Sequence, residues 1–356
     1  MRLLRDFVSS FLVLASLSAC NIHPHAWTPE KAPSLPVGTE VLTQSTAIDL
    51  LGYYGAEDFA VDSEGNIYCG SHKGESDFSS GAILKISPDG KVLPWVKTAA
   101  WVTGVEFDQE GRLLAMLHGV GLVRFNSKNS VDTLVTHTPN GAPLLMGAGM
   151  RQGVDGKIYF TNLSDRDQTS DQTIDKLFLE LRPQGGVYVF NPDTGEVETL
   201  REESYFPNGL ALSKEEDYLL VSETSKYRIL RYWLKGEQKG QWEVFMDNLP
   251  GFPNNISPRS NGNFWLGFTT KRNADLDKLH SKPFMKKVVY NLPNFLKPAP
   301  EAFGMLMEVS DEGQIIRTFL DSSGSQVAEA GAILEKEGTL YLGGDKVSYV
   351  SKLNEF

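Results

Sequence analysis

The chain repeats one short pattern six times, a tight turn followed by a run of β-branched or aromatic residues. The runs begin at Gly65, Gly111, Gly156, Asp217, Gly262 and Gly338. The first three glycines are 46 and 45 residues apart, and each run is followed by a second strand pattern. Repeats of ~40–50 residues made only of short strands and turns are typical of β-propeller blades. The sequence therefore predicts an all-β, six-bladed β-propeller whose loops gather at the end of a central channel.

Two insertions interrupt the repeat, at residues 163–181 and 271–298. The first ends in apolar residues at helical spacing, and the second mixes apolar residues with lysines and helix-breaking prolines. Both follow an inner strand, so we expect both at the same end of the propeller, as a lid on the channel or as cover for apolar rim surface. The lysines of the second insertion indicate either a solvated face or contact with an anionic lipid surface.

Residues 39–46 form a strand pattern that has no turn partner, while the last repeat lacks a strand. An N-terminal strand that completes the last blade would remove an exposed sheet edge. We therefore predict that residues 39–356 form one ring closed in this way.

The first 38 residues are predicted to lie outside the propeller. Residues 1–19 have the positive head and short apolar stretch of a signal peptide. The residues that end in Cys20 resemble a bacterial lipoprotein lipobox, which implies lipidation of Cys20 as a membrane anchor. The same resemblance implies a bacterial cell-envelope location, at the outer membrane facing the periplasm; an ordinary signal peptide cut elsewhere is the alternative. Residues 20–38 are rich in proline and predict a flexible tether.

Composition excludes several classes of function. The net charge is −11 and no basic cluster is interleaved with aromatic residues, so nucleic acid is not an expected partner. If Cys20 carries lipid, Cys69 has no partner, and its place in a strand run predicts a buried structural thiol. The chain has no nucleophile elbow, zinc-protease motif or phosphate loop, which leaves serine-hydrolase, zinc-protease and kinase activities without support.

Three stretches resemble a known family. Residues 206–256, which begin FPNGLAL and end GFPNNI, resemble the strictosidine-synthase-like propellers, especially the adipocyte plasma membrane-associated protein branch. Residues 55–68 and 338–344 are similar to the first and last blades of the same family. The resemblance extends more distantly to the gluconolactonase and paraoxonase group of calcium-dependent lactonases and arylesterases.

The resemblance implies a calcium site in the channel. Carried over residue by residue, it assigns Glu57 in the GAED turn, Asn208 in the FPNG turn, and Asn254 and Asn255 in the FPNN turn. Carboxylate and amide oxygens are the ligands that calcium prefers. The alternative is a structural role without a metal, in which these side chains cap loop amides.

Two departures from the family pattern weaken that site. Ala148 and Gly149 stand where the family has an Asn-Asp pair, and Asn254 stands where the family has Asp. Fewer carboxylates mean lower affinity for calcium.

Two histidines are the candidates for a general base. His118 ends an inner-strand run, at the position where paraoxonase-like enzymes are proposed to use a histidine to activate water, and His72 follows the first inner strand. The expected function is hydrolysis of a small-molecule ester or lactone. The alternative is a non-enzymatic binding or scaffold propeller that has lost its metal.

Strictosidine-type condensation is not expected. The glutamate on which strictosidine synthase relies corresponds to Gly331 here, and Glu329 lies two residues away. A shift of two residues along a strand would move the carboxylate by ~7 Å.

Overall fold

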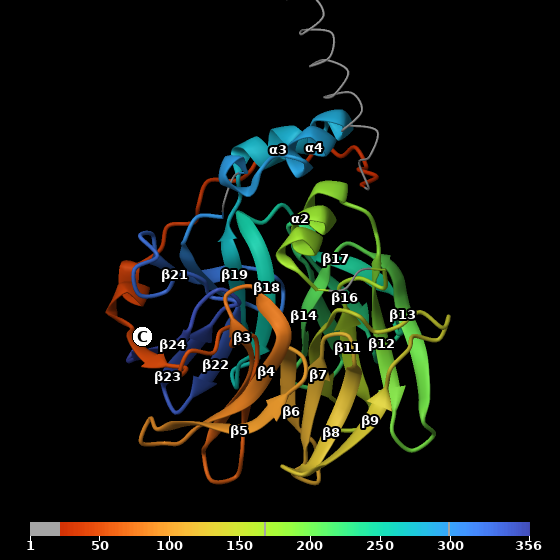
Figure 1. Ribbon diagram of the computed structural model, residues 1–356, viewed down its shortest axis with the longest axis vertical. Helices are drawn as coiled ribbons and strands as arrows, with labels where there is room; N and C mark the ends of the chain where they lie inside the picture. The colour runs from red at the N-terminus through yellow and green to blue at the C-terminus, as the bar shows by residue number, and fades with distance from the viewer. Residues whose placement is uncertain (1–21, 167–168, 298–299) are drawn as a thin grey trace, which may run out of the picture.

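The computed structural model describes residues 22–166, 169–297 and 300–356 and confirms the six-bladed β-propeller (Figure 1). Six four-stranded antiparallel sheets form the blades, and the first strand of each blade contacts the first strands of its neighbours around the channel. The signal peptide predicted for residues 1–19 and the lipidation predicted at Cys20 lie outside the described residues.

The first three blades follow one another along the chain. Blade 1 comprises β2 (Phe59–Val61), β3 (Ile67–Gly74), β4 (Asp77–Ile86) and β5 (Val92–Thr98). Blade 2 comprises β6 (Val102–Phe107), β7 (Leu113–Leu117), β8 (Gly121–Ser127) and β9 (Ser130–Val135). Blade 3 comprises β10 (Gly147–Gln152), β11 (Ile158–Asn162), β12 (Gly185–Asn191) and β13 (Glu196–Ser204).

The last three blades complete the ring. Blade 4 comprises β14 (Pro207–Leu212), β15 (Tyr218–Glu223), β16 (Arg228–Trp233) and β17 (Trp242–Met246). Blade 5 comprises β18 (Gly251–Pro258), β19 (Phe264–Lys271), β20 (Gly304–Val309) and β21 (Ile315–Asp321). Blade 6 comprises β22 (Ala332–Lys336), β23 (Thr339–Gly343), β24 (Tyr349–Asn354) and β1 (Thr46–Asp49).

An N-terminal strand closes the ring as predicted, but the prediction that residues 39–46 form it is wrong, because Glu40–Gln44 is a 3-10 helix and the strand follows it. Strand β1 is the outermost strand of blade 6 and pairs antiparallel with β24, with Thr46 opposite Lys352. It is preceded by a 3-10 helix, η1 (Glu40–Gln44), and a second short 3-10 turn, η2 (Thr224–Lys226), follows β15. Cys69 is fully buried in β3, and burial raises the pKa of its thiol to about 12, as expected of a structural cysteine.

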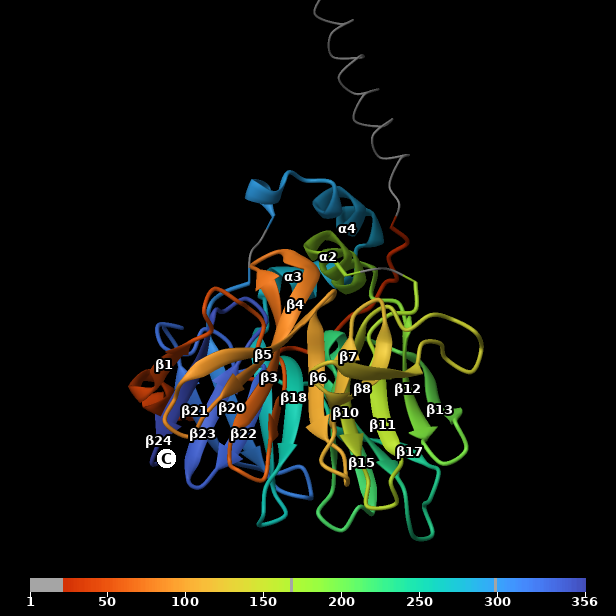
Figure 2. The ribbon, with the colours of Figure 1, turned by 60° about the horizontal axis from the view of Figure 1, so that its bottom comes forward.

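Both insertions form helices at one end of the propeller (Figures 1 and 2). The first contains α2 (Asp171–Glu180), and the second contains α3 (Ala274–His280), α4 (Pro283–Tyr290) and η3 (Asn294–Leu296). We call these elements the lid, because α4 packs on α2 and α2 lies over the channel end. No helix among the described residues is long and apolar enough to cross a membrane.

Residues 22–38 do not form the free tether that their composition predicted. They run across the lid, and we call them the strap. The His25 amide donates to the Glu180 carbonyl at 2.8 Å, and the Trp27 amide donates to the His280 carbonyl at 3.0 Å. The buried Lys286 ammonium donates to the His25 carbonyl at 2.8 Å. The strap therefore ties the two insertions together.

Replacing Trp27 by alanine should loosen the lid. The Trp27 ring lies 5.8 Å from that of Tyr227 and 5.4 Å from that of His280, and the Lys226 ammonium sits 4.1 Å from it. Losing this packing should destabilise the strap by about 2 kcal/mol. Hydrogen exchange in the strap and α3 should accelerate. Trp242→Ala, in outer strand β17, is the control and should leave exchange there unchanged.

Candidate active site

A cavity of about 90 Å³ lies at the lid end of the channel. Most of its polar walls come from the starts of first strands, in all six blades, and from the ends of second strands, in blades 2 to 6. The residues at the starts of first strands are Glu57, Thr103, Ala148, Asn208, Asn254 and Glu329. Those at the ends of second strands are His118, Leu163, Thr224, Thr269 and Asp345. All six blades therefore contribute to one site.

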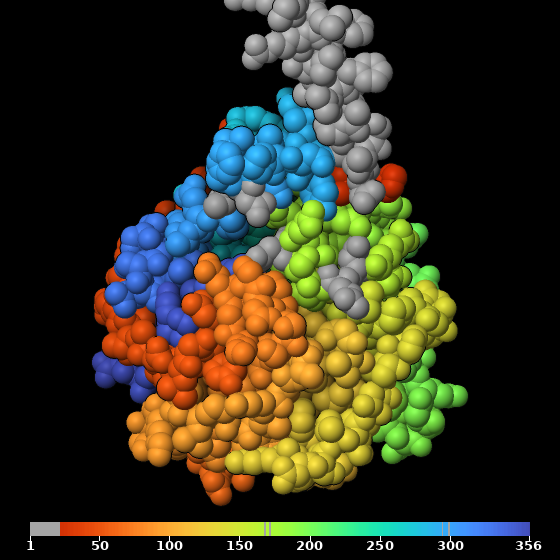
Figure 3. All heavy atoms as spheres, in the orientation of Figure 1, coloured from red at the N-terminus to blue at the C-terminus, as the bar shows by residue number. Residues whose placement is uncertain are grey.

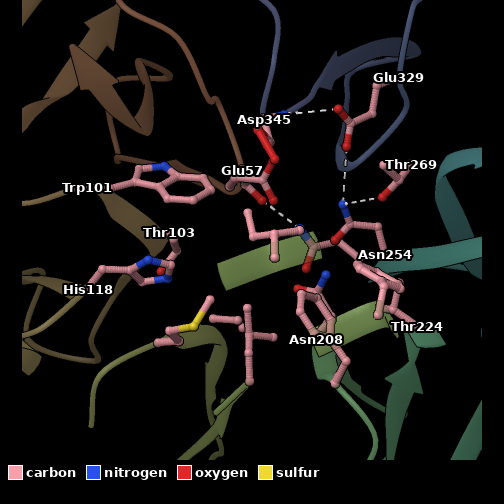
Figure 4. Close-up of a pocket in the computed structure, with 18 residues that line it drawn as sticks. Glu57, Trp101, Thr103, His118, Asn208, Thr224, Asn254, Thr269, Glu329 and Asp345 are labelled. Atoms are coloured by element: carbon pink, nitrogen blue, oxygen red, sulfur yellow. Dashed lines mark hydrogen bonds between the residues drawn. The ribbon is translucent and has the colours of Figure 1, made fainter. Parts of the chain in front are cut away.

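One side of the cavity is acidic (Figure 4). Burial raises the pKa of Glu57 well above its usual range, and the neighbouring carboxylates of Glu329 and Asp345 raise it further. Burial likewise raises the pKa of Glu329, with Asp345 as the next cause. Three carboxyl groups that cannot all ionise without mutual repulsion indicate a place where positive charge would be stabilised.

The predicted metal ligands Glu57, Asn208, Asn254 and Asn255 all line this cavity. The Asn254 amide nitrogen donates to Thr269 Oγ1 at 3.2 Å and to Glu329 Oε1 at 3.4 Å, which fixes its orientation. Asn254 Oδ1 and Glu57 Oε1 are buried and make no hydrogen bond. Buried polar atoms are rarely left without a partner, so these two oxygens are suited to bind a cation.

Asn255 has a second role. Its amide nitrogen donates to the Glu57 carbonyl at 2.5 Å, which joins blade 5 to the turn that carries the Glu57 carboxylate. The structure therefore brings the four predicted ligands together, with Asn255 also holding the Glu57 turn in place.

The donor set consists of oxygen atoms. Among the residues described, no group of three or more His, Cys, Asp or Glu side chains is arranged to hold a metal by itself. A cation in this cavity would therefore need asparagine oxygens as well as carboxylates, a donor set of the kind that calcium takes. Ala148 also lines the cavity and has no side-chain oxygen, as its departure from the family pattern implied.

His118 lines the cavity together with Trp101 and Thr103 (Figure 4). Its Nδ1 lies 2.5 Å from Thr169 Oγ1, and its Nε2 is buried without a hydrogen-bond partner. When Nδ1 carries the proton and donates to Thr169, Nε2 is a free acceptor. Burial lowers the pKa of His118 to about 3, so the ring is neutral near neutral pH.

His72, the other predicted base, does not fit that role. Its side chain is fully buried and is not among those that line the cavity. Its Nδ1 lies 2.6 Å from the Gly74 carbonyl oxygen and its Nε2 lies 2.9 Å from the Asp345 carbonyl oxygen. With both nitrogens occupied, His72 positions the loop that carries Asp345 and is not available to activate water.

Sequence reasoning missed the contribution of Glu329 and Asp345. The sequence predicts that the Glu329 carboxylate lies ~7 Å from the position of the strictosidine synthase glutamate, because each strand residue rises about 3.3 Å along the strand. In the structure Glu329 precedes β22 and lies in a loop, so the strand rise does not apply. A Cβ added to Gly331 would lie 2.9 Å from Glu329 Oε1 and 2.8 Å from Asn254 Nδ2. The Glu329 carboxylate thus occupies the space beside Gly331.

The opposite wall of the cavity is apolar. Helix α2 contributes Ile174 and Phe178, and Trp101, Met146 and Phe206 extend the same surface. The Phe178 ring packs 4.9 Å from that of Phe206. A ligand with one polar end and one apolar end would match both walls.

Comparisons with known proteins agree with this architecture. The strictosidine synthase family model matches residues 152–237, and the strictosidine synthase-like N-terminal model matches residues 40–75. Adipocyte plasma membrane-associated protein from Rattus norvegicus is 34% identical over 70% of this chain, and the match covers 69% of that protein. The chain belongs to the adipocyte plasma membrane-associated protein family.

A plant relative of this family, strictosidine synthase-like 3 of Arabidopsis thaliana, is 30% identical over 70% of the chain and 65% of its own length. The chain spans 62% of the mouse adipocyte protein and 49% of the human one.

Solved structures share the fold of this family member. A gluconolactonase from Xanthomonas campestris superimposes with a TM-score of 0.63 at 17% identity, over 94% of this chain and 99% of the other. Regucalcin from Agrobacterium tumefaciens, a calcium-binding protein, gives 0.55 at 12% identity, over 86% of this chain and 90% of the other. These likenesses show that the chain shares the propeller fold of the two structures.

The predicted bacterial outer-membrane location is wrong. The matching family members are vertebrate adipocyte plasma membrane-associated proteins and a plant strictosidine synthase-like protein, not bacterial lipoproteins. A short run of small residues before a cysteine is too brief a pattern to outweigh matches that extend over 70% of the chain.

Proposed function

We propose that this protein hydrolyses an ester or lactone with an apolar substituent, in the cavity at the lid end of the channel. The observation that carries the proposal is the pair of buried oxygens without partners, Glu57 Oε1 and Asn254 Oδ1, opposite the unpartnered Nε2 of His118. These atoms line one cavity and come from blades 1, 5 and 2.

The acidic side suits calcium. Glu57, Asn208 and Asn254 would hold the ion, and the neighbouring Glu329 and Asp345 carboxylates would supply the negative charge that Ala148 and Gly149 do not. Bound calcium would polarise a carbonyl group and stabilise the developing oxyanion. Because burial and mutual repulsion disfavour ionisation of Glu57 and Glu329, a bound cation would stabilise their charged forms.

His118 orients the attacking water. In the tautomer whose Nδ1–H donates a hydrogen bond to Thr169 Oγ1, the neutral Nε2 accepts a hydrogen bond from the water. Negative charge that develops on the substrate next to the ring raises the proton affinity of the imidazole as the reaction proceeds. The apolar wall formed by Trp101, Phe178 and Phe206 holds the apolar part of the substrate and excludes water.

Thermal melting with calcium or with chelator, together with turnover of aryl esters and lactones, tests the proposal. Calcium at 100 times its dissociation constant should stabilise the fold by ~2.7 kcal/mol. If calcium leaves the melting temperature unchanged and neither substrate class is turned over, the protein is better described as a non-enzymatic binding propeller.

The pH dependence of turnover gives a separate test of His118. Because burial holds its pKa at about 3, loss of activity in acid should not follow a group that titrates between pH 6 and 7. His118→Gln should lower kcat by about 100-fold. His137→Gln, at an exposed histidine, is the control and should leave kcat unchanged. An acid limb near pH 6.5 that disappears in His118→Gln would contradict this assignment.

A further inference from the structure

The second insertion exposes several large apolar side chains. Four of the fourteen large apolar side chains that the described residues expose lie between positions 284 and 296. Phe295 is 84% exposed, Phe284 64%, Leu296 56% and Met285 43%. The two phenylalanines are the only aromatic side chains in that exposed set. We call these four residues the lid patch.

The lid patch lies at the end of the molecule that carries the cavity. Figure 3 shows the atoms of this part of the chain, in light blue, as a raised mass above the blades. Helix α4, which carries Phe284 and Met285, packs on α2, whose Ile174 and Phe178 line the cavity. The Lys297 ammonium, next to the patch, pairs with Asp175 of α2 at 3.1 Å.

The charge around the lid patch has the opposite sign to that of the chain. The chain carries a net charge of −11. Of the five lysines among residues 274–297, Lys286 is buried and Lys278 and Lys297 pair with aspartates, so the lysines that border the patch are the other two. Lys282 is exposed beside Phe284, and Lys287 is partly exposed on the same helix. Exposed aromatic residues bordered by lysines are typical of surfaces that insert into the headgroup region of an anionic bilayer.

The chain outside the described residues starts from the same end. Ile22, the first described residue, is fully buried, and the His23 amide donates to the Glu180 carboxylate at the end of α2 at 2.6 Å. The residues before it include the apolar stretch 7–17, with Arg2 and Arg5 ahead of it. The described chain therefore begins at the lid.

We propose that the lid patch docks on an anionic membrane surface, with Phe284 and Phe295 inserted at the level of the headgroups and the lysines among the phosphates. A bilayer matches the patch better than a second protein, because the apolar side chains protrude and are bordered by positive charge. This docking does not depend on hydrolysis. It would place the cavity beside the bilayer, where apolar molecules concentrate.

A fluorescent probe in the full-length chain tests this proposal. In a Cys20→Ser background, an environment-sensitive dye on Phe295→Cys would report on the patch, while Cys69 stays buried and unlabelled. The dye on Val154→Cys, in the turn between β10 and β11 at the opposite end, is the matched control. The vesicles contain phosphatidylcholine alone or phosphatidylcholine with phosphatidylserine.

The probe at position 295 should shift its emission to shorter wavelength with the anionic vesicles, and the probe at 154 should not. Lys282→Glu with Lys287→Glu should weaken binding to anionic vesicles by about tenfold or more. Phe284→Ser with Phe295→Ser should weaken it to a similar degree, with unchanged melting temperature, because both side chains are exposed.

Three results would overturn the proposal. The chain could bind vesicles without a shift at position 295, which would assign binding to another segment. Both probes could shift equally, which would indicate non-specific adsorption. The shift at 295 could appear without vesicles and grow with protein concentration, which would show that a second copy of the chain covers the patch.

Discussion

Glu57→Gln is expected to lower kcat for ester or lactone hydrolysis by about 100- to 1000-fold and to remove the stabilising effect of calcium. Glu57 is the one carboxylate among the four ligands that the family resemblance assigned, and its Oε1 is buried without a partner. Glutamine keeps the shape but loses the charge that would hold the ion. Steady-state kinetics and melting with and without calcium measure the two effects. Glu237→Gln, in an exposed turn, is the control and should change neither.

When calcium is chelated, Glu57→Gln should make the protein more stable than wild type at high pH. Burial and two neighbouring carboxylates raise the pKa of Glu57, so its ionised form opposes folding. For a carboxyl group whose folded pKa lies above its unfolded pKa, stability falls as pH rises between the two values. Chelated wild type should therefore lose stability as pH rises above about 4.5, and chelated Glu57→Gln should lose less. A variant that is less stable than wild type in chelator at pH 8 would contradict the like-charge cluster.

Arg151→Leu is expected to cost 3–5 kcal/mol of unfolding free energy, as does the loss of one partner from a buried ion pair. The Arg151 guanidinium donates to both carboxylate oxygens of Asp58, at 2.9 and 3.2 Å, and both residues are largely buried. It also lies near Glu106. These residues belong to blades 3, 1 and 2, so the substitution leaves two carboxylates uncompensated inside the channel. Chemical denaturation measures the loss.

Arg124→Leu is the matched control for the buried pair. Arg124 pairs with Asp132 at 3.1 Å on the surface of blade 2, where Asp132 is well exposed. Exposed pairs contribute about 0–1 kcal/mol, so this variant should unfold almost as wild type does. Equal losses in the two variants would show that the buried pair has no special role.

The pH dependence of stability reports on the same cluster. Burial raises the pKa of Glu106 to about 7, although Arg151 opposes the shift. Stability should therefore decrease as pH rises from about 4.5 to about 7, because the folded state binds the proton more tightly than the unfolded state. In Arg151→Leu this decrease should be larger and extend to higher pH. A flat profile in both proteins would place Glu106 in a more solvated position.

The blade repeat made most of the fold predictable. Each turn and strand run is a local pattern, and the spacing of Gly65, Gly111 and Gly156 shows that the unit recurs. The same repeat predicts that His118, at the end of an inner strand, lies at the channel end. Glu57 and Asn208 were assigned to the channel by the family resemblance and not by the repeat.

The features that the sequence did not predict depend on contacts between residues far apart in the chain. The proline-rich strap looked like a free linker because its partners, among them Glu180 and His280, lie in insertions far along the chain. Glu329 reaches the cavity because blade 6 begins with an irregular loop, and only Gly331 and Gly344 leave room for its carboxyl group. His72 looked like a base at a strand end, but the carbonyl oxygens that surround it come from two separate loops.

The pairing of β1 with β24 has a consequence for how the molecule is made. One blade joins residues that are about 300 positions apart, so the ring stays open on the ribosome until residues 349–354 have emerged. Until then blade 6 lacks two of its four strands, and β1 has no edge to join. Sheet edges left open during synthesis attract other chains. The nascent protein should therefore depend on chaperones until β24 has emerged and pairs with β1.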